Sequence, residues 1–230
     1  MPTHTPTVML VHGAWADEAS WNKTLAVLHS NSVKTVTVGL PMTSLDGDVA
    51  ALDAALDTLP GTAVLVGHAY AGAVIGATRS TKVKALVYVA GLAPDEGETV
   101  AEVFNRFGHD EPTPALAPSA DGRIWLPADA FETAFAQDAS PTEQKALAAA
   151  QRPISPACIT VPATAPLWKH VPAWYLLAER DHMIPARTQR FVAERMRAHV
   201  HAYPVDHVPQ VTAPALVAHV VGEALAGIGS

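Results

Sequence analysis

Residues 64–75 read as a buried strand, a sharp turn and a helix, with Ala69 at the centre of the turn. Gly67 and Ala71 lie two residues to either side of Ala69, and Gly72 extends the run of small residues. A turn of this kind holds its central side chain above the end of a sheet in a strained conformation, and close packing demands small neighbours. A serine hydroxyl at the centre would be placed to attack a carbonyl. Ala69 has no oxygen, so the turn suits a nucleophile that the chain lacks.

Two further residues could perform acid–base chemistry. His207 lies in a loop between the last apolar run and the last helical segment, and Asp181 lies three residues beyond another apolar run. An imidazole can take a proton from a hydroxyl near neutral pH, and a buried carboxylate fixes its tautomer. Glu179, Asp206 and Asp95 are alternative carboxylates. We prefer Asp181 for its place before the turn that ends in Ile-Pro.

Six short apolar runs would supply the strands that position these residues. They are continuous rather than alternating, which is typical of parallel strands buried on both faces. Helix-period segments lie between the runs, and this alternation predicts an α/β fold with a six-stranded, mainly parallel sheet flanked by helices. The runs span residues 7–11, 33–40, 63–66, 84–90, 173–178 and 199–205, and the clearest helical segments span 48–59, 185–196 and 214–226.

Between residues 94 and 171 the alternation stops, and the chain becomes rich in alanine, proline and acidic residues. This stretch is too long for an ordinary connection, so we expect an inserted helical cap. The expected division is a core of residues 1–93 and 172–230 with a cap of residues 94–171. We expect Trp125 and Trp168 of the cap to contact substrate, and packing within the cap is the alternative for each ring.

Four segments resemble the α/β-hydrolase superfamily and follow each other in its order. They are VHGAW at 11–15, VGHAYAG at 66–72, LLAERDHMIP at 176–185 and VDH at 205–207. The resemblance runs along the whole chain and is closest to small bacterial esterases related to plant esterases and hydroxynitrile lyases. The second segment matches the VGHSYAG form of the nucleophile elbow at every position except the serine. The resemblance therefore implies an α/β-hydrolase fold.

The same resemblance assigns roles to individual residues. Position 69 is the nucleophile position, where serine is expected in place of Ala69. His207 would be the general base and then the general acid, and Asp181 the carboxylate that orients it. The backbone N–H groups of Ala14 and Tyr70 would form the oxyanion hole. These roles are those of a carboxylic ester hydrolase that works through an acyl-serine intermediate.

The expected substrate is a small molecule with an ester-like bond, and no cofactor is implied. Trp15 is the last residue of the VHGAW segment and is expected to flank the substrate cavity. An ester, a lactone, a thioester and an activated amide would all suit this machinery, because the fold alone does not choose among them.

Composition limits the other partners. The formal net charge is −7, so phosphate backbones and anionic lipid would be repelled, and neither nucleic acid nor a membrane is an expected partner. No apolar stretch approaches the ~20 residues of a membrane span. Residues 1–7 lack the layout of a signal peptide, so we expect a cytoplasmic protein. Cys158 is the single cysteine, and the histidines show no ligand spacing, so no metal site is expected. The oligomeric state is not indicated.

Three explanations of Ala69 compete. The first is an engineered serine-to-alanine change that inactivates an esterase. The second is a natural ligand-binding or sensing protein that has lost its nucleophile, and the third is a lyase or oxygenase that needs only the His207–Asp181 base. We prefer the first for two reasons. Every neighbour of Ala69 keeps the VGHSYAG pattern of an active elbow, and a chain that had lost its nucleophile naturally could have relieved the strained turn with glycine. The chain as written is then expected to be inactive or nearly so.

Overall fold

The computed structural model describes residues 6–110 and 112–229. Within these ranges six strands form one sheet in the order β2-β1-β3-β4-β5-β6, and every neighbouring pair is parallel. The predicted six-stranded parallel sheet is therefore confirmed, with shorter strands than expected near 33–40 and 199–205. The strands are β1 (Thr7–Val11), β2 (Thr35–Val38), β3 (Ala63–His68), β4 (Val83–Val89), β5 (Ala173–Ala178) and β6 (His199–Tyr203).

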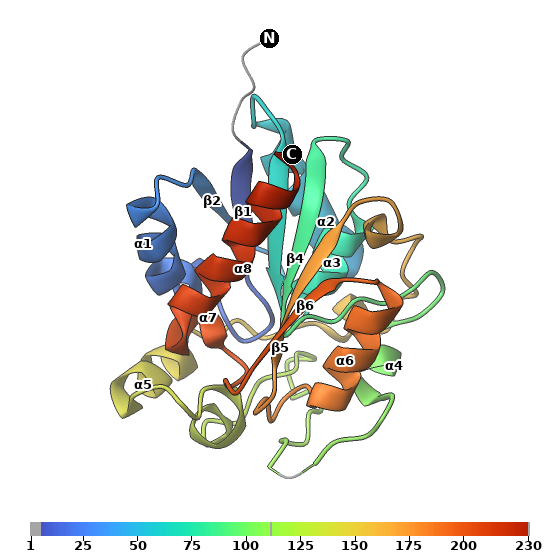
Figure 1. The fold of residues 1–230 in the computed structure, drawn as a ribbon. Helices are drawn as coiled ribbons and strands as arrows, with labels where there is room; N and C mark the ends of the chain where they lie inside the picture. The colour runs from blue at the N-terminus through green and yellow to red at the C-terminus, as the bar shows by residue number, and fades with distance from the viewer. Residues whose placement is uncertain (1–5, 111, 230) are drawn as a thin grey trace.

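Alternate residues of the central strands belong to two hydrophobic clusters on opposite faces of the sheet. Val8 and Leu10 of β1 join the cluster covered by α1 (Asn22–Ser30) and α8 (Pro214–Gly227). Met9 and Val11 join the cluster covered by α2 (Leu45–Asp57), α3 (Ala71–Ala77) and α6 (Ala186–Arg195). Figure 1 shows α1 and α8 on the viewer's side of the sheet and α2 and α3 behind it. Burial on both faces explains why the strands read as continuous apolar runs.

Helix ends follow local capping chemistry. The helix α2 begins at Leu45, three residues before the predicted start, because Ser44 accepts a hydrogen bond from the backbone N–H of Gly47. Proline supplies the first position of α7 (Pro209–Thr212) and of α8. None of the helices in the described ranges is long and apolar enough to cross a bilayer.

Most of the segment between β4 and β5 lies beyond the carboxyl ends of the strands, and its last part returns to the amino end of β5 (Figure 1). It contains α4 (Val100–Asn105), α5 (Pro141–Ala150) and the short helical turns Phe131–Phe135, Pro156–Cys158 and Leu167–Lys169. Its buried apolar residues, among them Ile124 and Phe131, belong to the same cluster as one face of the sheet. The segment thus closes over the end of the sheet where the predicted site residues gather, while its separation as a cap domain stays a prediction.

Candidate active site

Ala69 occupies the turn between β3 and α3 with a φ of 48°, a left-handed conformation that costs a residue with a Cβ about 1–2 kcal/mol. The surrounding backbone enforces this conformation. The N–H of Ala69 donates to the carbonyl of Val89 across 3.1 Å, and the carbonyl of Ala69 accepts from Leu92 N–H across 2.9 Å. The strain predicted for this position is therefore present, and the methyl group of Ala69 lines a cavity.

The small residues around the turn are required by contact distances. A Cβ added to Gly67 would lie 2.9 Å from the carbonyl oxygen of Ala71. A Cβ added to Gly72 would lie 2.5 Å from the carbonyl oxygen of Leu92. Both separations are shorter than ordinary van der Waals contact, so a larger residue at either position would push the strand and the helix apart.

His207 and Asp181 are joined by a 2.8 Å hydrogen bond from Nδ1 to Oδ2, and both side chains are almost fully buried. The other carboxylate oxygen of Asp181 accepts the backbone N–H groups of Met183 and Ile184 across 2.7 and 2.8 Å. These bonds fix the plane of the carboxylate. Because Nδ1 of His207 is occupied, Nε2 is the ring nitrogen left for a reacting group on the cavity side.

The loop that carries His207 is held by buried aromatic neighbours. Nε2 of His68 bonds the backbone carbonyl of His207 across 2.8 Å, and the two imidazole rings lie 4.8 Å apart between centroids. Burial lowers the pKa of His68 well below its ordinary value, so this ring is neutral and donates to the carbonyl. The ring of Phe135 lies 5.2 Å from that of His207. The imidazole of His207 is thus positioned by packing as well as by Asp181.

The alternative carboxylates do not reach the imidazole. Asp206 is buried, and its Oδ1 accepts the hydroxyl of Thr212 across 2.6 Å while its Oδ2 accepts the N–H of Asp138 across 3.2 Å. Burial raises the pKa of Asp206. Asp95 forms an ion pair with Lys169. The geometry therefore favours Asp181 as the partner of His207.

Backbone N–H groups of Ala14 and Tyr70 lie at the same cavity, which both residues line. Neither N–H has a hydrogen-bond acceptor among residues 6–110 and 112–229. The loop that carries Ala14 is fixed by His12, whose Nε2 accepts the N–H of Leu40 across 3.0 Å and whose Nδ1 bonds the carbonyl of Gly13 across 2.9 Å. Two preorganised donors without acceptors are what an oxyanion hole provides.

Tyr70 is anchored from below by Asp48, which sequence reasoning did not single out. The phenol donates to Oδ2 of Asp48 across 2.7 Å, and the N–H of Met42 donates to Oδ1 across 2.7 Å. The thiol of Cys158 lies 3.6 Å from the same Oδ2. Asp48 is completely buried, and its burial raises the pKa of the carboxyl. Three donors therefore hold this carboxyl in the core beneath the turn.

The cavity has a volume of about 520 Å³ and a mainly apolar lining. The turn residue Ala69, the imidazole of His207 and Trp15 line it together. Trp15 has a φ of 58°, and its indole N–H donates to the carbonyl of Ile124 across 2.9 Å. Most of the remaining wall comes from the segment between β4 and β5, including Val100, Phe104, Leu116, Ile124, Ile154 and Ile159.

Trp125 and Trp168 are not among the residues that line the cavity, so the structure does not place them where substrate contact requires. Trp125 follows Ile124 in an extended stretch whose side chains alternate, so Ile124 faces the cavity while the indole of Trp125 is 43% exposed and bonds Asp121. Trp168 packs near Gly76 of α3, on the far side of the turn. Sequence alone could not distinguish the inner from the outer face of this irregular segment.

The chain belongs to the α/β-hydrolase family. The sequence profile described as "Alpha/beta hydrolase family" matches residues 8–220. No curated protein sequence matches the chain significantly.

Solved structures share the fold at low sequence identity. Polyneuridine aldehyde esterase superposes with a TM-score of 0.82 at 18% identity, covering 99% of this chain and 100% of the other. A pyrethroid hydrolase from Sphingobium faniae JZ-2 gives 0.82 at 18% identity, with 97% and 98% covered. A methylesterase from Arabidopsis gives 0.77 at 16% identity, with 96% and 99% covered. The expected likeness to the plant esterases is confirmed at the level of the fold.

Proposed function

We propose that this chain is a carboxylic ester hydrolase of the serine type in which alanine replaces the nucleophile at position 69. The observation that carries the proposal is the convergence of three parts on one cavity. The methyl group of Ala69, the imidazole of His207 backed by Asp181, and the acceptor-free N–H groups of Ala14 and Tyr70 all belong to it. What alanine does not supply is a hydroxyl at position 69.

In the serine form, the hydroxyl at position 69 would attack the ester carbonyl as Nε2 of His207 takes its proton. The negative charge that develops on the carbonyl oxygen would be met by the N–H groups of Ala14 and Tyr70, and each such donor contributes about 3 kcal/mol. The imidazolium then protonates the departing alcohol. A water molecule, deprotonated by the same ring, hydrolyses the acyl-serine and restores the enzyme.

The alanine form keeps the cavity and the donors and loses the covalent route. Removing the nucleophile from a serine triad lowers kcat by about 10⁶-fold. The proposed occupant is a small ester with a moderately apolar acyl or alcohol part, because the lining is mostly aliphatic and aromatic. A chain of this kind would bind its ester and leave it uncleaved.

We interpret Ala69 as an engineered replacement, and two considerations support this. Ala69 keeps a left-handed φ that strains a residue with a Cβ, and the imidazole of His207, bonded to Asp181, lies at the same cavity. In addition, a serine-to-alanine variant of the structurally similar pyrethroid hydrolase has been solved, with a TM-score of 0.77 at 18% identity. A serine codon at position 69 of the source gene would establish the interpretation directly.

The test is to restore the nucleophile. We expect Ala69→Ser to hydrolyse a short-chain p-nitrophenyl ester with an initial burst, and the original chain to show almost none of this activity. A fluorophosphonate should label the restored chain at residue 69, as located by peptide mass spectrometry. His207→Ala added to Ala69→Ser serves as the control, and it should abolish the gain.

Two outcomes would contradict the proposal. Absence of any gain in Ala69→Ser, with the fold intact, would show that the site does not support acyl transfer. Turnover of a substrate by the original chain that disappears in His207→Ala would instead identify chemistry that needs only the base.

A further inference from the structure

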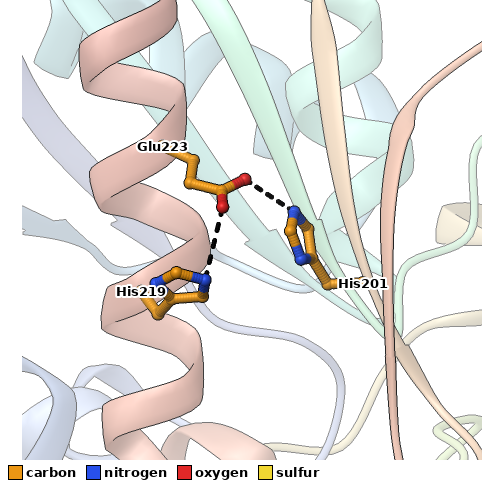
Figure 2. Close-up of side chains that lie close together, drawn as sticks. All are labelled: His201, His219 and Glu223. Atoms are coloured by element: carbon orange, nitrogen blue, oxygen red, sulfur yellow. Dashed lines mark ion pairs between the residues drawn. The ribbon is translucent and has the colours of Figure 1, made fainter.

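Outside the cavity, three side chains with metal-binding chemistry meet on the surface between β6 and α8. His201 lies on β6, the edge strand of the sheet, and His219 and Glu223 lie one turn apart on α8. Figure 2 shows both imidazole rings directed at the carboxylate of Glu223. None of the three residues lines the cavity of about 520 Å³. The cluster is therefore separate from the proposed active site.

The three side chains are close enough to share a metal ion through two nitrogen ligands and one oxygen ligand. Nε2 of His201 lies 2.7 Å from Oε2 of Glu223, and Nε2 of His219 lies 3.3 Å from Oε1. One ligand atom from each residue can be chosen so that the three lie within 4.8 Å of one another. Zinc binds these atom types at 2.0–2.2 Å in a tetrahedron, which places its ligands about 3.3 Å apart. Small side-chain rotations are enough to reach that geometry.

The surroundings leave the carboxylate without a permanent counter-charge. Within residues 6–110 and 112–229, Glu223 forms ion pairs with these two histidines and with no lysine or arginine. A neutral imidazole supplies a hydrogen bond but no positive charge, whereas a divalent cation supplies the charge and uses both Nε2 lone pairs. The side chains of His201, Glu223 and His219 are 23%, 40% and 55% exposed. Solvent can therefore reach the cluster to deliver the ion and to provide the fourth ligand.

The framework already holds the three ligands in place. His219 and Glu223 are separated by four positions, which puts them on the same face of α8. The ring of His201 stacks against Tyr203, with 6.4 Å between centroids and 16° between planes, and meets the ring of His219 edge-on at 5.7 Å. Little side-chain freedom has to be lost when an ion binds, and a site of this kind needs no rearrangement of the backbone.

We propose that His201, His219 and Glu223 form a surface site for a divalent transition metal ion, with zinc as the fitting ion. Sequence spacing did not indicate this site, because His201 and the α8 pair are brought together only by the packing of α8 beside β6. The ion would tie the edge strand to the last helix on either side of the loop that carries His207. Its expected effect is on the stability of that corner, and it takes no part in the ester chemistry.

The test uses the full chain stripped of metal. Calorimetric titration with Zn²⁺ should show saturable binding of about one ion per chain, and the melting temperature should rise with zinc concentration. Co²⁺ should bind at the same site with the visible absorption of a four-coordinate ion. His201→Ala, His219→Ala and Glu223→Gln should each weaken zinc binding about tenfold or more.

Matched controls separate this site from other histidines. His199→Ala removes an exposed imidazole two residues away on the same strand, and His207→Ala removes the imidazole of the cavity. Both should leave the zinc affinity and the cobalt spectrum unchanged. The three ligand variants lie on two different elements. If circular dichroism shows that one of them is misfolded, the zinc affinities of the other variants still test the proposal. Absence of saturable binding, or binding that persists in the His201→Ala/His219→Ala double variant, would overturn the proposal.

Discussion

The side-chain amide of Gln189 donates to Oδ2 of Asp181 across 2.9 Å, and this oxygen is the one that accepts from His207. The same amide is anchored to the end of β5, because its Oε1 accepts the N–H of Ala178 across 2.9 Å. Its Nε2 also lies 2.7 Å from the carbonyl of Ile184. Gln189 is fully buried. It does not line the cavity, so we expect it to be a positioning residue that orients the carboxylate.

Replacing Gln189 by leucine in the Ala69→Ser chain should lower kcat about tenfold and leave KM nearly unchanged, because outer partners of a charged group typically contribute this much. Gln189→Glu should be worse than leucine, since a second carboxylate would face Asp181. Steady-state kinetics on an aryl ester measure both effects. Gln144→Leu, which removes a half-buried side-chain amide that bonds the carbonyl of Ala136 and has no contact with Asp181, is the control. If Gln189→Leu lowers thermal stability and its kcat per folded molecule is unchanged, Gln189 has a structural role only.

The left-handed backbone at Ala69 makes a prediction about stability. Ala69→Gly should raise the free energy of unfolding by about 0.5–1 kcal/mol, because the strain relieved at φ 48° exceeds the extra entropy that glycine gains in the unfolded chain. Chemical denaturation measures the change. Ala54→Gly at an exposed interior position of α2 is the matched control and should lower the free energy by about 1 kcal/mol. A loss of stability in both variants would show that the turn is not strained.

Much of this architecture could be predicted from sequence because the signals are local. Apolar runs gave the parallel sheet, and the pattern of small residues around Ala69 predicted both the turn and its strain. His207 and Asp181 could be selected because each follows a strand end, and carboxyl ends of parallel strands meet at one edge of a sheet.

Other parts depend on contacts between distant segments, which carry no local signature. Asp48 reads as an ordinary helical acid, yet it lies under Tyr70 in the core. Much of the cavity wall comes from an irregular segment where side-chain direction has no period, so sequence could not indicate that Ile124 lines the cavity while Trp125 and Trp168 do not. Metal ligands on β6 and α8 are likewise joined only by tertiary packing.

Cys158 should be chemically silent in the folded chain. Burial, together with the nearby carboxylate of Asp48, raises the pKa of the thiol to about 12, and the side chain has no exposed surface. At pH 8 the thiolate fraction is then about a thousandfold lower than in an unfolded chain. Alkylation by iodoacetamide should therefore be at least that much slower under native conditions than in denaturant. Comparable rates in the two conditions would contradict the buried placement of Cys158.

The buried carboxyl of Asp48 predicts how stability depends on pH. Burial raises its pKa in the folded state, while hydrogen bonds from Tyr70 and Met42 oppose that rise. The folded state therefore binds this proton more tightly than the unfolded state. The resulting stabilisation is fully present below the unfolded pKa of about 3.9 and is lost as the pH rises through the folded pKa.

Asp48→Asn cannot titrate at this position, so the comparison isolates the effect. The free energy of unfolding of the original chain minus that of Asp48→Asn should fall as the pH is raised from about 4 to about 7, since an ionised carboxylate is costly in the core. Urea denaturation across that range measures the difference. Asp46→Asn, exposed on the same helix, controls for the loss of one negative charge. A difference that grows with pH would mean that the donors around Asp48 outweigh its burial and hold it as a carboxylate.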